Sequence, residues 1–128
     1  MKPYQTRLKT EHSDLLYVQI LQKLTGEKLY RDPGYNAQKL AADLGTNRRY
    51  ISASVATHTG GGNYATLVNG MRLREVCRML DSHRYAQYTV EEIGLLSGFA
   101  SRQAFYLAFR KQFNITPREY RLGKRNTE

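Results

Sequence analysis

The chain has 128 residues, enough for one compact domain or for two very small lobes that share a connecting element. Its 20 Lys and Arg residues against 11 Asp and Glu residues give a formal net charge of +9. This balance favours a polyanionic partner such as nucleic acid without fixing the fold. A single cysteine, Cys77, excludes an internal disulfide, and no segment approaches the ~20 apolar residues of a membrane span.

The first lobe is expected to span residues 13–62, after a flexible N-terminal arm at 1–12. Ser13 or Asp14 can cap a first helix that ends at Gly26. The apolar stripe of this helix consists of Leu15, Leu16, Val18, Ile20, Leu21 and Leu24. We therefore expect one long amphipathic helix at the start of the lobe.

Two short helices follow in the first lobe. Asn36 caps the first of them, Gly45 ends it, and Asn47 caps the second. Ile51 and Val55 are four residues apart, so they face inward together. The outer face of the second helix carries Arg48, Arg49 and Ser52. This pattern predicts a helix-turn-helix with a basic outer face.

A linker helix at 63–83 is expected to join the two lobes. The glycine-rich stretch 59–63 precedes it and lacks the residues of a phosphate-binding loop, so it is interpreted as a connector. A helix over 64–82 would be ~28 Å long at 1.5 Å per residue. Successive major grooves lie ~34 Å apart on one face of B-DNA. A helix of this length could hold two lobes near that separation.

The second lobe, 84–121, repeats the same arrangement before a basic C-terminal tail at 122–128. Thr89 and Glu92 form a capping-box pair, Gly98 marks the turn, and a last short helix follows Pro117. The residues expected to face inward are Ile93, Leu96, Phe105, Phe109 and Phe113. The outer face of the longer helix carries Arg102, Gln103, Tyr106 and Arg110.

The two lobes form a weak internal repeat. Gly45 and Gly98 are 53 residues apart, whereas the caps Asn47 and Ser101 are 54 apart, which indicates one inserted residue in the second turn. The repeat predicts an all-α fold of about seven helices, in which two helix-turn-helix subdomains are joined by a long linker helix.

Enzymatic chemistry is not expected. The three histidines and Cys77 do not stand at metal-ligand spacing, so no metal or cofactor site is predicted. Glu91 and Glu92 belong to a helix start, where the helix dipole favours them, and not to a catalytic pair. No nucleophile stands beside a base in the sequence.

The second lobe carries TVEEIGLLSGFASRQAFYLAFRKQFNITPREYR, and the first carries LAADLGTNRRYIS. Over about residues 36–121 the chain resembles the DNA-binding domain of the AraC/XylS transcription regulators. Residues 13–33 look like the helix and loop that precede such domains in regulators of the Bacteroidetes type. The resemblance implies a cytoplasmic transcription regulator that inserts two recognition helices into successive major grooves.

The resemblance also implies residue roles. Base readout would fall to Arg48, Arg49, Ser52 and Ala53 in the first lobe and to Arg102, Gln103, Tyr106 and Leu107 in the second. Arg can bind guanine through two hydrogen bonds and Gln can bind adenine in the same way. Residues suited to DNA phosphates, which set affinity and register but not sequence, are Arg110, Lys111, Arg118, Arg121, Lys124 and Arg125.

The sequence departs from the family pattern at the first recognition helix. Ser52 and Ala53 stand where Arg, Lys or Gln is frequent, and Leu107 stands where a base-reading Arg is common. The first lobe could therefore dock mainly through its arginines. The alternative is a protein-interaction or non-specific nucleic-acid-binding module, for duplex or RNA, that keeps the fold but has lost base readout in the first lobe.

The partners expected from the resemblance are double-stranded DNA and RNA polymerase, with no membrane. Residues 1–35 are too few for a ligand-binding barrel or a receiver domain, so a sensor domain is absent from this chain. The sequence fits either the output end of a longer regulator or a small regulator that acts alone.

Overall fold

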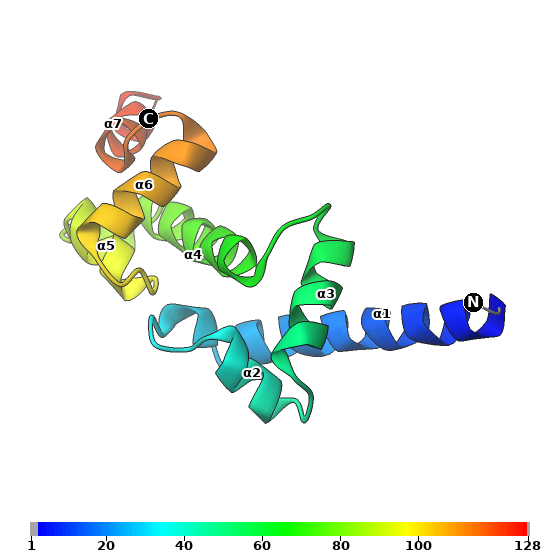
Figure 1. Cartoon of the computed structure of the whole chain (residues 1–128). Coiled ribbons are helices and arrows are strands. Elements are labelled where there is room, and N and C mark those ends of the chain that lie inside the picture. The colour runs from blue at the N-terminus through cyan, green and yellow to red at the C-terminus, as the bar shows by residue number, and fades with distance from the viewer. Residues whose placement is uncertain (1–2, 128) are drawn as a thin grey trace. The chain divides into compact units, whose positions relative to one another are not determined.

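The computed structural model describes the backbone of residues 3–127 and the side chains of residues 10–123. Over the described backbone the chain forms seven α-helices and no strand, which confirms the predicted all-α fold (Figure 1). The helices are α1 (Pro3–Gly26), α2 (Ala37–Asp43), α3 (Arg48–His58), α4 (Tyr64–Leu80), α5 (Val90–Leu96), α6 (Arg102–Phe113) and α7 (Pro117–Thr127). Short 3-10 turns occupy Leu29–Arg31 and His83–Tyr85.

The helices divide into two compact units. The first comprises Met1–Leu29 and Tyr35–Val68, and the second comprises Tyr30–Gly34 and Asn69–Glu128. The last boundary between the units, after Val68, falls inside α4. This helix therefore contributes residues to both units. α4 itself ends at Leu80, two residues before the end of the helix expected over 64–82.

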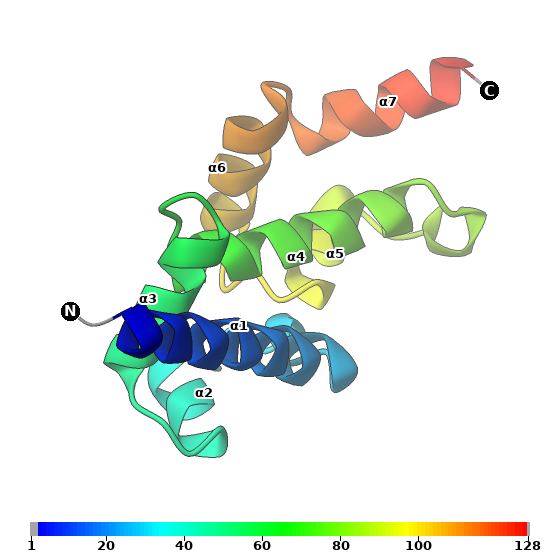
Figure 2. The same cartoon turned by 90° about the vertical axis from the view of Figure 1, so that its right-hand side faces the viewer.

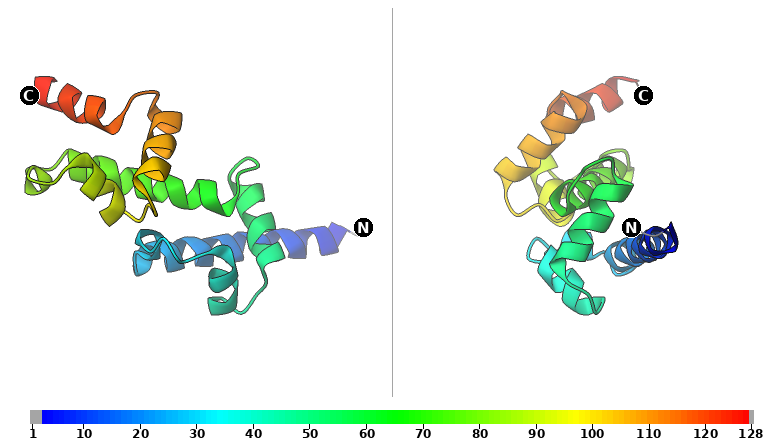
Figure 3. Two further views of the ribbon diagram at one scale, coloured as in Figure 1. Left: turned by 60° about the vertical axis from the view of Figure 1, so that its left-hand side comes forward. Right: turned by 45° about the vertical axis from the view of Figure 1, so that its right-hand side comes forward.

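The first unit is built on the contact between α1 and α3. α3 crosses α1, and α2 packs beside α3 (Figures 1 and 3). Asn36 accepts a hydrogen bond from the Lys39 amide at 2.9 Å, and Asn47 accepts one from the Tyr50 amide at 3.0 Å. Both predicted caps are thus confirmed. The core of this unit consists mainly of Leu16, Ile20, Leu24, Leu40, Ala41, Ile51 and Val55.

The start of α1 differs from the prediction. The helix begins at Pro3 and passes through Ser13 and Asp14, so the expectation that one of these two residues caps its start is wrong. Residues 3–12, which were expected to form a flexible arm, belong to the helix. Proline is well tolerated in the first turn of a helix, and no glycine interrupts the sequence between Pro3 and Gly26. The long helix was missed because the apolar periodicity starts only at residue 15.

The apolar stripe of α1 is also narrower than predicted. Leu16, Ile20 and Leu24 are buried at a spacing of four residues, whereas Leu15 is 58% exposed and Val18 is 48% exposed. A helix that rests against one partner helix buries only one row of side chains. Leu15 and Val18 lie outside that row.

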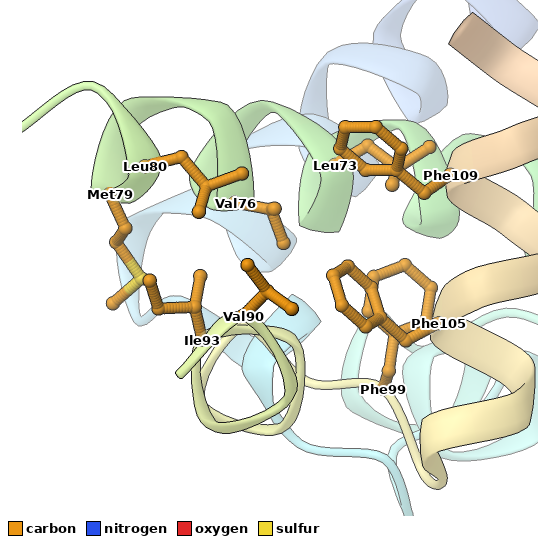
Figure 4. Close-up of a cluster of buried hydrophobic side chains, with 9 residues drawn as sticks. All are labelled: Leu73, Val76, Met79, Leu80, Val90, Ile93, Phe99, Phe105 and Phe109. Carbon is orange, nitrogen blue, oxygen red and sulfur yellow. The ribbon is translucent and has the colours of Figure 1, made fainter. Parts of the chain in front are cut away.

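The second unit has one hydrophobic core shared by α4, α5 and α6. Figure 4 shows apolar side chains of the three helices converging, with the rings of Phe99, Phe105 and Phe109 at one end of the cluster. The complete cluster is Leu73, Val76, Met79, Leu80, Val90, Ile93, Phe99, Phe105 and Phe109. α7 follows α6 and contacts it (Figure 2).

Two residues of this lobe that were predicted to face inward, Leu96 and Phe113, are partly exposed. Leu96 is 46% exposed, because the buried row of α5 runs through Val90, Ile93 and Gly94 and ends at the buried Ser97. Phe113 is 36% exposed, so it lies at the margin of the core and not inside it. The predicted inward positions Phe105 and Phe109 are fully buried and are confirmed.

A short segment, Tyr30–Gly34, is part of the second unit although α1 and α2 belong to the first. The Arg72 guanidinium donates to the Tyr30 carbonyl at 2.7 Å, and Arg31 forms an ion pair with Glu75. A Cβ atom on Gly98, whose φ is +112°, would lie 2.2 Å from the Tyr30 carbonyl oxygen. The turn of the second helix-turn-helix therefore requires glycine both for its backbone conformation and for this close approach.

Candidate nucleic-acid interface

In the first unit, α3 presents the predicted reading face to solvent. Ile51 and Val55 are buried against the core, which fixes the rotation of the helix. The opposite face is exposed and carries all four residues predicted for the first lobe: Arg48, Arg49, Ser52 and Ala53. Their exposure follows from the buried pair at i and i+4, which defines the outward face of the helix. Their role in base readout stays a prediction.

A hollow of about 360 Å³ lies beside the first turn of this reading face. Arg48 and Ser52 of α3 line one side of it, and Gln38, Asn63 and Tyr64 line other parts. Asn63 caps α4 by accepting a hydrogen bond from the Thr66 amide at 2.9 Å. The sequence identified Asn63 only as a cap, because its position beside Arg48 depends on tertiary packing.

The N-terminal half of α1 borders the other edge of the same face. A larger hollow, about 980 Å³, is lined by Thr10, His12 and Ser13 of α1 and by Arg49, Ala53 and Thr57 of α3, among others. The His12 ring makes an edge contact with Tyr50, with ring centroids 6.1 Å apart. These α1 residues were not predicted to flank the reading face, because residues 1–12 were expected to be a flexible arm and Ser13 a helix cap.

Polar contacts fix α1 against α3. The Ser54 hydroxyl donates to the Ser13 carbonyl at 2.8 Å. The His58 ring stacks on Tyr17 with centroids 4.5 Å apart, and its Nε2 lies 2.7 Å from an Asp14 carboxylate oxygen. The hydrogen bond between the His58 ring and the Ser54 carbonyl raises the pKa of His58 above its ordinary value, and the hydrogen bond to Asp14 raises it further. Protonated His58 thus stabilises this helix crossing.

In the second unit, α6 presents the corresponding face. Ser101 caps the helix by accepting a hydrogen bond from the Ala104 amide at 3.1 Å. Burial of Phe105 and Phe109 turns Arg102 and Gln103 to solvent. Leu107 is 74% exposed, which is high for a large apolar side chain. The predicted positions Arg102, Gln103 and Leu107 are therefore accessible to a partner.

Tyr106 differs from its neighbours because it is half-buried and hydrogen-bonded. Its hydroxyl donates to an oxygen of Glu91 at 2.7 Å, and Arg118 donates to the same oxygen at 2.8 Å. The Arg102 guanidinium lies 3.8 Å from that oxygen and 5.9 Å above the Tyr106 ring. Hydrogen bonds from Arg118 and then Tyr106 lower the pKa of Glu91 to about 2. We call these residues, Glu91, Arg102, Tyr106 and Arg118, the Glu91 cluster.

The helix-turn-helix arrangement occurs in known proteins. A family model described as a helix-turn-helix domain matches residues 40–123, about two thirds of the chain. A transcriptional regulator from Chromobacterium violaceum with an AraC-type DNA-binding domain is similar in structure, with 27% identity and a TM-score of 0.61 over 70% of this chain and 77% of that chain. The chain belongs to the AraC-type helix-turn-helix family.

Other solved structures share the fold. The C-terminal domain of the two-component response regulator yesN from Fusobacterium nucleatum is 24% identical, with a TM-score of 0.65 over 79% of this chain and 94% of that chain. A DNA-binding transcriptional dual regulator from Escherichia coli K-12 is 14% identical, with a TM-score of 0.69 over 84% and 90%. A comparison with curated proteins finds no match.

Membership of the AraC-type family means that the chain is a DNA-binding domain of transcription regulators and not an enzyme. Among the described residues, no group of three or more His, Cys, Asp or Glu side chains could hold a metal ion. None of the helices formed by these residues is both long and apolar enough to cross a membrane.

The AraC-type fold separates the predicted phosphate residues into different environments. Arg110 and Lys111 are exposed on α6. Arg118 is held by Glu91, and Arg121 donates to the Tyr88 and Tyr85 carbonyls at 2.6 and 3.0 Å. Arg121 therefore joins α7 to the segment before α5. The side chains of Lys124 and Arg125 lie outside the described residues.

Proposed function

We propose that the chain is a sequence-specific transcription regulator whose α3 and α6 enter successive major grooves of one duplex. The observation that carries this proposal is that each of the two helix-turn-helix motifs presents an exposed arginine on its outer face. Arg49 lies on the outer face of α3, and Arg102 lies at the start of α6. The net charge of +9 supplies the long-range attraction to DNA.

The two faces differ in the chemistry that they offer to DNA bases. α6 carries Arg102 and Gln103, whose side chains can make paired hydrogen bonds to guanine and adenine, each worth about 1–3 kcal/mol of discrimination. α3 carries Ser52 and Ala53, which can contact thymine methyl groups but cannot make paired hydrogen bonds. We therefore infer that the second lobe contributes more of the sequence preference.

The first lobe then contributes mainly affinity and register. Arg48 and Arg49 are exposed on α3 and can bind phosphate or guanine, and the hollow beside Arg48 is bordered by the start of α4. In the second lobe, Arg110 and Lys111 on the last turns of α6 can bind phosphates. Phosphate contacts position a protein on the duplex but do not read its sequence.

A salt titration of binding tests this proposal. Affinity for a selected promoter fragment and for an unrelated duplex is measured from about 50 to 200 mM salt, where each phosphate contact adds about 0.9 to the slope of log K against log salt. The selected fragment should bind more tightly at every salt concentration. Equal affinity for all duplexes, or equal competition by RNA, would contradict sequence-specific binding.

Alanine variants locate the binding faces. Arg49→Ala and Arg102→Ala should both weaken binding, and Arg102→Ala should also reduce the preference for the selected fragment. Lys23→Ala is a charge-matched control, because Lys23 lies near the C-terminal end of α1 and pairs with Glu27 at 3.5 Å. If both arginine variants bind like the control, the fold serves as a protein-interaction module instead.

A further inference from the structure

One carboxylate lies inside the reading face of the second lobe. Glu91 is in the first turn of α5, yet its side chain is only 18% exposed because it reaches α6 and α7. Its Oε1 atom meets the Tyr106 hydroxyl, the Arg118 guanidinium and, at 3.8 Å, the Arg102 guanidinium. A negative charge beside a DNA-binding face opposes phosphate binding, so its position requires an explanation.

We propose that Glu91 is a specificity-determining positioning residue, which holds Arg102 and Tyr106 in place for base readout and restrains Arg118 from binding phosphate. This inference rests on the proposed function of α6. Glu91 acts through the other members of the Glu91 cluster and does not itself contact DNA.

The contacts of the Glu91 cluster restrain the Tyr106 side chain more than the Arg102 side chain. Tyr106 donates its hydroxyl proton to Glu91 at 2.7 Å and its oxygen lies 3.4 Å from the Arg118 Nε, so the ring is a fixed support. Arg102 is 68% exposed, and among the described side chains it is held by the 3.8 Å ion pair and by the Tyr106 ring. Arg102 can therefore leave Glu91 for a guanine edge while its starting position remains limited.

The restraint favours correct over incorrect DNA. On the correct sequence, two hydrogen bonds to guanine replace the weak contact of Arg102 with Glu91. On an incorrect sequence, only phosphates are available, and an arginine that binds one must give up its contact with the Glu91 carboxylate, so Glu91 opposes this binding. Because the pKa of Glu91 is about 2, the carboxylate stays charged at every pH used for DNA binding.

The neighbouring carboxylate provides a matched control. Glu92 belongs to the same helix turn and carries the same charge, but its side chain accepts a hydrogen bond from the Thr89 backbone amide at 3.3 Å in the capping box. Glutamine also serves at this position of a capping box. Glu92→Gln therefore removes one charge near α5 without disturbing Arg102, Tyr106 or Arg118.

The experiment compares Glu91→Gln and Glu92→Gln with the unaltered chain in binding to selected and unrelated duplexes. Glu91→Gln should bind unrelated duplex several-fold more tightly, with a salt slope steeper by about 0.9 because Arg118 gains a phosphate. Its ratio of selected to unrelated affinity should fall by about tenfold, the discrimination of one paired contact. Glu92→Gln should leave the ratio unchanged.

Two results would overturn the inference: an unchanged ratio in Glu91→Gln, or the same fall in ratio in Glu92→Gln. A second readout does not depend on sequence preference. Side-chain nitrogen relaxation of Arg102 in the free protein should show greater mobility in Glu91→Gln than in Glu92→Gln, and equal mobility would exclude the restraint. If the unaltered chain shows no sequence preference, the proposed function fails, whereas this mobility measurement still decides whether Glu91 restrains Arg102.

Tyr106→Phe separates the two parts of the Glu91 cluster. It keeps the ring beneath Arg102 and the ion pair between Glu91 and Arg118 but removes the hydroxyl donor. The ratio of affinities should fall less than in Glu91→Gln. A larger fall would assign the selectivity to direct base contact by the hydroxyl and would contradict the positioning role of Glu91.

Discussion

Gly98→Ala should destabilise the protein far more than Gly45→Ala, although the two glycines occupy matching turns. A Cβ atom on Gly98 would lie 2.2 Å from the Tyr30 carbonyl oxygen and 2.7 Å from the Arg31 Cα atom, whereas a Cβ atom on Gly45 would meet nothing within 4 Å. The atoms around Gly98 belong to the backbone, so they cannot move by a change of rotamer. The segment Tyr30–Gly34 would have to shift.

The magnitude follows from these two environments. At Gly45, with φ of +67°, alanine costs only the left-handed backbone conformation, about 1–2 kcal/mol. At Gly98, with φ of +112°, the backbone strain of about 1–3 kcal/mol adds to loss of the bond from Arg72 to the Tyr30 carbonyl, about 1–3 kcal/mol when a buried partner is left unpaired. We expect a total near 3–5 kcal/mol for Gly98→Ala.

Urea denaturation followed by far-ultraviolet circular dichroism measures both changes. If the two units unfold in separate transitions, Gly98→Ala should lower only the midpoint of the second unit. Equal losses of unfolding free energy in the two variants would show that the Tyr30–Gly34 segment does not press on the turn, and would refute the reasoning.

Three further predictions concern stability. The raised pKa of His58 means that its stabilising contribution is complete below pH ~6.5 and is lost as pH rises through the folded-state value, so His58→Gln should flatten the dependence of melting temperature on pH between about 5.5 and 8. The lowered pKa of Glu91 acts in the opposite direction: its contribution is complete above pH ~4.5 and is lost as pH falls toward 2, and Glu91→Gln should remove this acid sensitivity. Phe105→Ala should lower the free energy of unfolding by about 3–5 kcal/mol, whereas Phe113→Ala, on a partly exposed ring of the same helix, should cost much less; equal losses would contradict the assigned core.

Local sequence signals predicted most of the fold because they act within one turn of helix. Asn36, Asn47 and Ser101 each accept a hydrogen bond from the amide three residues later, as a cap requires. Burial of Phe105 and Phe109 then determines which residues of α6 face outward. The predicted reading positions on α3 and α6 follow from the same periodicity.

Contacts between distant residues were not predictable in this way. The capping-box pattern predicted the role of Glu92, but no local signal indicates that the neighbouring Glu91 reaches Arg118, 27 residues away. The position of Gly98 against Tyr30 likewise depends on a segment far earlier in the chain. The helical N-terminal half of α1 was missed because its apolar pattern is absent, and helix propensity alone is a weak signal.

Selection of bound sites from a pool of random DNA tests the central claim most directly. The account predicts two short conserved blocks whose centres are about 10–10.5 base pairs apart, one for each recognition helix. The block read by α6 should contain guanine for Arg102 and should be lost in Arg102→Ala, while the other block remains. A single block in the unaltered chain, or two blocks with no fixed spacing, would contradict the claim that α3 and α6 read successive major grooves.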